Sequence, residues 1–127
     1  MAAAKILVIE DNPANLELAT FLLEVEGHVV LQATTAEEGI ALAKAQSPDV
    51  IVMDVGLPGM DGLEATRVLR KDPATKDIPV IAATSHAMKG DKEQIMAAGC
   101  DDYVAKPLDT RTFAQQVARH VGMRRGT

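Results

Sequence analysis

Four short apolar runs in this chain each end in polar side chains that can bind a cation or react. These side chains are the carboxylates of Glu10, Asp11 and Asp54, the hydroxyls of Thr84 and Ser85, and the amine of Lys106, which precedes Pro107. Each is ordinary alone, because an Asp at a strand end usually caps a turn and a Lys before Pro is usually solvated. Their occurrence at the ends of four separate runs indicates a site.

The acids of this set favour a divalent cation. As close neighbours, Glu10, Asp11 and Asp54 would repel one another and raise the pKa of at least one carboxyl, unless a cation lies among them. Oxygen-only clusters suit Mg²⁺, which usually takes one or two carboxylates and completes its shell with water and phosphate oxygens. The predicted site is therefore incomplete without a phosphoryl group.

Asp54 is the candidate acceptor of that phosphoryl group. A carboxylate can attack phosphorus and form an aspartyl phosphate, while the metal and Lys106 neutralise the equatorial oxygens of the transition state. Gly56 would allow a close approach of the backbone, so that N–H groups near Val55, Gly56 and Ser85 face the phosphoryl oxygens. The sequence therefore predicts covalent phosphorylation of Asp54.

The elements that would position these residues alternate between strands and helices along the whole chain. Continuous apolar runs predict central strands of a parallel sheet, and capping residues predict the starts of helices. The expected strands are 6–9, 28–31, 50–53, 78–83 and 103–105, and the expected helices run from Asn12 to Gly27, Thr35 to before Pro48, Asp61 to Arg70, Met88 to Ala98, and near Asp109 to Gly122. This alternation predicts an α/β fold, whose ligands bind beyond the carboxyl ends of the strands.

Helical spacing of apolar residues predicts which helix faces pack on the sheet. Residues at i, i+3, i+4 and i+7 share one face of a helix. The expected inward residues are Leu18, Phe21, Leu22 and Val25 in the first helix, and Phe113, Val117 and Val121 in the last.

Length and composition are those of a folded globular domain. The chain has 127 residues, 47% hydrophobic and 24% charged, and its apolar runs fall far short of the roughly 18 residues that span a membrane. The net charge of −5 with scattered Lys and Arg residues argues against nucleic-acid binding, and the lone Cys100 fits a reducing compartment. We expect one domain over residues 1–127, with its core at about 4–122, in the cytoplasm and without membrane binding.

Four motifs of the chain resemble the receiver domain of two-component response regulators. They are ILVIEDN, IVMDVGLPGMDG, IAATSHAMKGD and DDYVAKPLD, which occur in this order over nearly the whole chain. The resemblance implies a doubly wound, flavodoxin-like fold, with a five-stranded parallel sheet of order 2-1-3-4-5 and five helices on both faces. The stretch AMKGDKEQIMAAGCDDYVAKPL is similar to stand-alone receivers of the DivK type and to receivers fused to hybrid kinases.

The resemblance implies a phosphorelay role for the clustered residues. Asp54 would take a phosphoryl group from a histidine of a histidine kinase or a histidine phosphotransferase. Mg²⁺ would be held by Glu10, Asp11, Asp54 and the backbone carbonyl of Gly56, and Lys106 would contact the phosphoryl group.

The resemblance further implies a switch next to this site. Thr84 would be the hydroxyl that moves toward the phosphoryl oxygens, and Tyr103 the aromatic side chain that swings inward with it. The movement would alter the surface of the fourth helix, fifth strand and fifth helix, where a downstream protein partner binds. The peptide bond before Pro107 is expected to be cis, as is common in the family.

Other functions fit parts of this pattern. A phosphatase with an aspartate nucleophile needs a second Asp two residues later, where this chain has Gly56. A nucleotide or flavin binder would carry a glycine-rich loop after the first strand, where Glu10 and Asp11 stand. An inactive receiver is disfavoured because every expected site residue is present. Metal binding by His86 is disfavoured because the three histidines share no ligand spacing.

These features predict a signalling protein that catalyses only its own phosphorylation and dephosphorylation. Because the chain starts with Met and stops soon after the last helix, we expect a stand-alone protein. The alternative is the receiver portion of a hybrid histidine kinase.

Overall fold

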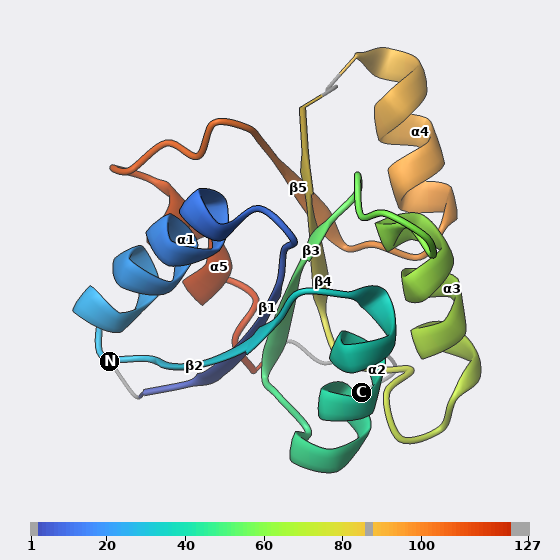
Figure 1. The fold of residues 1–127 in the computed structure, drawn as a ribbon, viewed down its shortest axis with the longest axis horizontal. Helices are drawn as coiled ribbons and strands as arrows, with labels where there is room; N and C mark the ends of the chain where they lie inside the picture. The colour runs from blue at the N-terminus through green and yellow to red at the C-terminus, as the bar shows by residue number, and fades with distance from the viewer. Residues whose placement is uncertain (1–2, 86–87, 123–127) are drawn as a thin grey trace.

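The computed structural model of the protein describes residues 3–85 and 88–122, in which strands and helices alternate (Figure 1). The strands are β1 (Lys5–Ile9), β2 (Val29–Ala33), β3 (Val50–Asp54), β4 (Val80–Thr84) and β5 (Asp102–Ala105). The helices are α1 (Pro13–Val25), α2 (Ala36–Gln46), α3 (Gly62–Lys71), α4 (Lys89–Ala97) and α5 (Phe113–Ala118).

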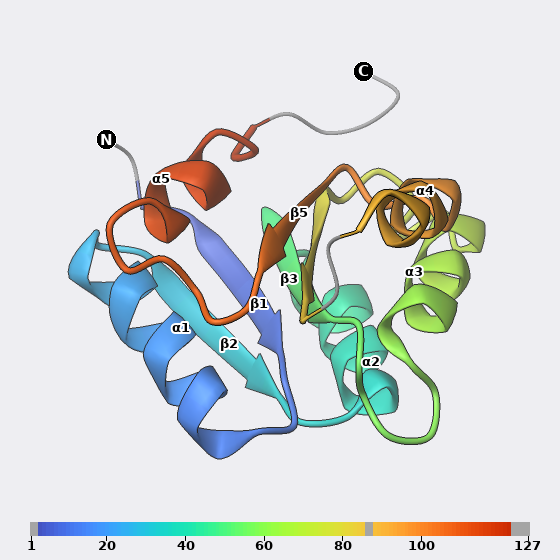
Figure 2. The same ribbon diagram turned by 90° about the horizontal axis from the view of Figure 1, so that it is seen from above.

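The strands form one parallel, five-stranded sheet in the order β2-β1-β3-β4-β5. Helices α1 and α5 cover one face of this sheet, and α2, α3 and α4 cover the other (Figure 2). The chain winds from β1 to one edge and then returns to build the other edge, so the winding reverses between β1 and β3. The predicted doubly wound α/β fold is confirmed, and its binding crevice is expected beside the ends of β1 and β3.

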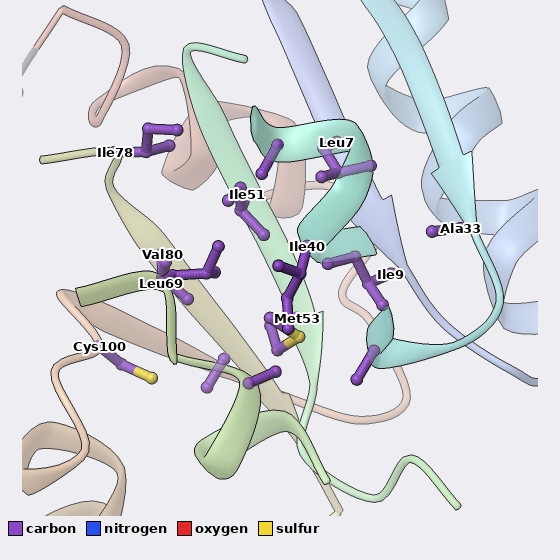
Figure 3. Close-up of a cluster of buried hydrophobic side chains, with 14 of the residues drawn as sticks. Leu7, Ile9, Ala33, Ile40, Ile51, Met53, Leu69, Ile78, Val80 and Cys100 are labelled. Atoms are coloured by element: carbon purple, nitrogen blue, oxygen red, sulfur yellow. The ribbon is translucent and has the colours of Figure 1, made fainter. Parts of the chain in front are cut away.

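Two hydrophobic clusters attach the helices to the sheet. One fills the space between the sheet and α2, α3 and α4, and Figure 3 shows its side chains from β1, β3 and β4 pointing toward these helices. Its largest fully buried members are Leu7, Ile9, Ile51, Met53, Leu69, Ile78 and Ile95. The other lies under α1 and α5, and includes Ile6, Val8, Leu23, Phe113 and Val117. Because both faces are covered, the central strands are apolar without alternation.

Side-chain caps fix the starts of three helices at the predicted residues. Asn12 Oδ1 accepts a hydrogen bond from the Asn15 N–H at 3.1 Å. Thr35 Oγ1 accepts from the Glu38 N–H at 3.1 Å, and Asp61 Oδ1 accepts from the Glu64 N–H at 2.9 Å. These bonds satisfy N–H groups that have no partner within the helix.

The predicted inward face of α1 is wrong for Phe21 and Val25, whereas Leu22 packs against the cluster under α1 and α5. Phe21 and Val25 are 61% and 62% exposed. The side chains buried against the sheet are those of Leu16, Ala19 and Leu23. They follow the same helical spacing as the predicted stripe, so spacing alone does not distinguish the two faces, and the small Ala19 lets the helix approach the sheet closely.

Several element bounds also differ from the prediction. Strand β2 begins at Val29 and extends to Ala33, and β4 runs to Thr84. Regular helix α5 begins at Phe113 rather than near Asp109, because the Asp109 carbonyl accepts from the N–H groups of both Thr112 and Phe113 in a tight turn. His86 lies outside the described residues.

Candidate functional site

Two buried carboxylates lie at the carboxyl ends of adjacent strands. Glu10 directly follows β1 and Asp54 ends β3, and each is only 5% exposed. Asp11, the next residue after Glu10, is exposed. Carboxylate oxygens of these three residues lie within 4.8 Å of one another. The register of the two strands therefore brings together acids that are more than forty positions apart in the sequence.

Lys106 bridges the two buried acids. Its Nζ lies 2.8 Å from Glu10 Oε1 and 2.8 Å from Asp54 Oδ1. Lys106 follows β5, and its backbone N–H donates to the Thr84 carbonyl at the end of β4 at 2.8 Å. The pairing of β5 with β4 thus places the Lys106 amine next to the two acids. Its positive charge offsets part of their mutual repulsion.

The three charges shift one another's proton affinities. Burial and the hydrogen bond with Asp54 raise the pKa of Glu10 above its usual value. Burial alone would raise the pKa of Asp54, but hydrogen bonds from Glu10, Lys106 and the Gly56 N–H outweigh it and lower that pKa. Burial opposes the charged form of Lys106, yet its two carboxylate partners raise its pKa. Asp54 therefore stays ionised, as a nucleophile must.

The loop after β3 orients the Asp54 carboxylate. The Gly56 N–H donates to Asp54 Oδ1 at 3.0 Å, while the Val55 N–H donates to the Ala83 carbonyl at 3.0 Å. In this arrangement the Val55 N–H is thus hydrogen-bonded to β4, and its predicted contact with a phosphoryl group stays a prediction. A Cβ on Gly56 would lie 3.7 Å from Asp54 Oδ1, an ordinary contact, so close approach of the backbone does not require glycine here.

One cleft gathers most of the predicted site residues. Its lining is formed by Glu10, Asp11, Asn12, Asn15, Asp54, Val55, Gly56, Thr84, Ser85 and Lys106. The Thr84 side chain is 5% exposed, whereas Ser85 is exposed. Tyr103 and Pro107 lie outside this cleft and line a separate groove between β5 and α5. The Lys106–Pro107 peptide bond is cis.

Two residues shape the site without having been predicted to do so. The backbone N–H of Asn12 donates to Glu10 Oε2 at 3.1 Å, in addition to the capping role of its side chain. Gly62, the first residue of α3, packs on the backbone of Asp54, and a Cβ there would clash with the Asp54 carbonyl oxygen and lie 2.9 Å from its carbonyl carbon. Neither contact leaves a periodic signal in the sequence; the only hint is the Asp-Gly pair that starts α3.

Comparison with known proteins agrees with this geometry. The response regulator receiver domain model matches residues 6–118. The chain belongs to this family, the receiver domains of two-component systems. It is 38% identical over 117 residues to the polar-differentiation response regulator DivK of Brucella ovis, covering 92% of this chain and 95% of that protein.

Solved structures show the same fold. The chemotaxis protein CheY4 of Vibrio cholerae superposes with a TM-score of 0.89 at 27% identity, covering 94% of this chain and 100% of that one. The receiver domain of a sensor histidine kinase from Pseudomonas aeruginosa superposes with a TM-score of 0.87 at 35% identity, covering 95% and 99%. That structure has a magnesium ion coordinated in its active site cleft. Among the described residues of the present chain, no helix is long and apolar enough to cross a membrane.

Proposed function

We propose that the protein is a single receiver domain that accepts a phosphoryl group on Asp54 from a phosphohistidine of a histidine kinase or histidine phosphotransferase. The observation that carries this proposal is the buried Asp54 carboxylate in contact with Lys106, beside two further acids. A purely structural ion pair would not need Glu10 and Asp11 at the same edge of the sheet. The arrangement fits a centre that stabilises added negative charge.

The acid cluster fits Mg²⁺. Its ligand atoms would be oxygens only, from three carboxylates whose oxygens lie within 4.8 Å of one another, and Mg²⁺ prefers such ligands together with waters and phosphate oxygens. Glu10, Asp11 and Asp54 would hold the ion, with the Gly56 carbonyl as a further ligand. When bound, Mg²⁺ supplies charge that stabilises the transferring phosphoryl group.

The atoms of Asp54 have separate tasks in the transfer. Lys106 Nζ and the Gly56 N–H both donate to Oδ1, so neither occupies Oδ2. Oδ2 attacks the phosphorus of the phosphohistidine, a P–O bond forms, the P–N bond breaks, and its electron pair returns to the imidazole nitrogen. Lys106 then contacts the phosphoryl oxygens, and Thr84 and the N–H groups of Gly56 and Ser85 donate to them.

The signal is carried to a surface beside the cleft. Thr84 ends β4 and Tyr103 lies on the neighbouring β5, so movement of the hydroxyl toward the phosphoryl group changes the room available to the ring. Reorientation of Tyr103 alters the face formed by α4, β5 and α5. A downstream protein binds this face, and the phosphoryl group shifts the equilibrium between its two arrangements.

Phosphorylation by a small phosphodonor tests this function. Wild-type protein incubated with acetyl phosphate and Mg²⁺ gains the mass of one phosphoryl group, and Asp54→Asn gains none. The control Asp77→Asn, half-buried and remote from the cleft, gains the group like the wild type. Equal labelling of Asp54→Asn and wild type, or labelling of the wild type unaffected by EDTA, contradicts the proposal.

A second candidate is the same receiver joined to a kinase. The 35% identity to the receiver of a sensor histidine kinase favours it. The phosphoacceptor chemistry is the same in both cases, and the mass of the native protein on an immunoblot distinguishes them.

A further inference from the structure

A cation lies over the side chain of the proposed switch tyrosine. Lys92 Nζ, on α4, is 5.3 Å from the centroid of the Tyr103 ring on β5. This is within the range of a cation–π interaction, in which the negative face of the ring attracts the ammonium group. Nothing in the proposed phosphoryl chemistry uses Lys92, which lies outside the acid cleft.

Strand β5 is held from both faces of the sheet. Tyr103 packs against the cluster under α2, α3 and α4. Its neighbour Asp102 faces α5, where its carboxylate lies 2.9 Å from His120 Nε2 and accepts from Gln116 Nε2 at 3.1 Å. Figure 2 shows β5 between α4 and α5. Lys92 makes the contact on the α4 side of β5, and the Asp102 carboxylate makes the contacts on the α5 side.

Among the side chains that the structure describes, none in the first half of α4 is buried in the core. Its N-cap residue, Met88, makes no side-chain cap and is 76% exposed. Of the described α4 side chains, the one buried in the core is Ile95, in the second half of the helix, and Ala98 is buried just past its end. Lys92 therefore supplies a side-chain contact between the first half of α4 and β5.

Lys92 has no competing carboxylate partner among the described residues. The ion pairs found there involve other cations. Lys92 is half-buried, its ammonium group lies over the Tyr103 ring, and no acid among the described residues forms an ion pair with it.

We propose that Lys92 is a positioning residue that holds the Tyr103 ring against α4 in the unphosphorylated protein and must release it when the ring turns toward Thr84. The alternation of side chains between the two faces of the sheet supports this rotation of the ring toward Thr84. Tyr103 pairs with Ala82, and Thr84 lies two residues after Ala82, so Thr84 and Tyr103 share one face of the sheet. The inference rests on the proposed function, in which Tyr103 reorients.

The chain provides its own probe for this contact. It has one tyrosine and no tryptophan, so its ultraviolet emission reports on Tyr103 alone. Without any phosphoryl group, quenching by acrylamide compares wild type, Lys92→Met and Lys92→Arg. We expect stronger quenching in Lys92→Met, which keeps the stem but loses the charge, and wild-type quenching in Lys92→Arg. Lys76→Met, an exposed lysine remote from the ring, is the control.

The second measurement follows the emission during titration with beryllofluoride and Mg²⁺, a mimic of the phosphoryl group. If Lys92 stabilises only the resting arrangement, Lys92→Met reaches half of the change at about two- to five-fold lower concentration than wild type, the factor that a cation–π contact supports. Lys92→Arg and Lys76→Met titrate like wild type. Far-UV circular dichroism checks that each variant is folded.

Unchanged quenching in Lys92→Met, or a titration midpoint equal to or higher than that of wild type, overturns the inference. If wild-type emission does not respond to beryllofluoride, the proposed switch fails, and the quenching comparison alone decides whether Lys92 holds the ring.

Discussion

Lys106 Nζ lies 2.8 Å from carboxylate oxygens of both Glu10 and Asp54, so it would compete with a metal ion bound to the same two acids. Lys106→Met removes one positive charge next to the proposed Mg²⁺ position. Because like charges within a few ångströms repel strongly in a partly buried site, we expect Mg²⁺ to bind at least about threefold more tightly. Isothermal titration calorimetry at pH 7 measures the change.

Lys76→Met is the matched control for this charge removal and keeps wild-type affinity. Asp11→Asn should weaken binding, since it removes a ligand oxygen charge. Weaker Mg²⁺ binding by Lys106→Met would show that Lys106 does not face the ion.

Gly62 and Gly90 form a matched pair of helix glycines. A Cβ on Gly62 clashes with the Asp54 backbone, whereas a Cβ on Gly90 meets nothing within 4 Å. Gly62→Ala should lower the free energy of unfolding by about 1–3 kcal/mol through overpacking, and Gly90→Ala should raise it by about 0.4–1 kcal/mol. Urea denaturation followed by circular dichroism measures both. Equal effects of the two substitutions would mean that α3 does not rest on Asp54.

At the scale of residues, the site could be predicted from the sequence where reactive side chains stand at the ends of strands. Glu10, Asp54 and Lys106 could be grouped because parallel strands present their carboxyl ends at one edge. The contacts that orient these side chains could not be predicted. The Asn12 N–H and the Gly62 contact are backbone features that depend on the path of the loops.

Arg70 ties the end of α3 to β4 and to the turn between α4 and β5. Its guanidinium donates to the carbonyls of Gly99 at 2.9 Å and Ile78 at 2.7 Å, and to Asp101 Oδ2 at 2.9 Å. Arg70→Lys replaces a planar fork of donors by one ammonium group, which cannot reach all of these partly buried acceptors at once. We expect a loss of about 2 kcal/mol in the free energy of unfolding.

Arg67→Lys, on the exposed side of the same helix, is the control and should change stability by less than about 0.5 kcal/mol. If the two substitutions have equal effects in urea denaturation, the Arg70 contacts do not stabilise the attachment of α3.

The starts of the helices were predicted better than the helix faces that pack on the sheet. The caps at Asn12, Thr35 and Asp61 gave the starts of α1, α2 and α3, since each cap is a local interaction. The inward face of α1 was predicted only in part, because Leu16 and Leu23 compete with Phe21 and Val25 at the same spacing, and only packing on the sheet selects between them.

For the whole molecule, Asp102 links β5 to α5 and makes stability depend on pH. Burial would raise its pKa, but hydrogen bonds from His120, Gln116 and the Tyr103 N–H lower it below its usual value. The folded protein therefore binds a proton here less readily than the unfolded chain. The stabilisation is fully present above the ordinary Asp pKa of about 3.9, and it is lost as pH falls through the lower folded pKa.

Asp102→Asn should therefore be less stable than wild type by about 1 kcal/mol at pH 7, with the difference shrinking as the pH falls below about 4. Urea titrations at a series of pH values measure it, with Asp77→Asn as the control. A difference that stays constant down to pH 3 would contradict a role for the Asp102 charge.

The overall topology was accessible by two independent routes. Alternating apolar runs and capped helices predicted the α/β class, because only a covered parallel sheet makes strands such as Val50–Met53 apolar on both faces. The strand order came from the resemblance of motifs and not from periodicity, which carries no information on which strands are neighbours.

The central claim is that Asp54 carries the phosphoryl group, and its most direct measurement is location of the modified residue. Protein phosphorylated with acetyl phosphate and Mg²⁺ is reduced with borohydride, which converts an aspartyl phosphate to homoserine, and its peptides are analysed by mass spectrometry. We predict homoserine at position 54, and none when EDTA replaces Mg²⁺. A reduced residue at another acid, or no reduced residue in protein that has gained phosphoryl mass, would contradict the account.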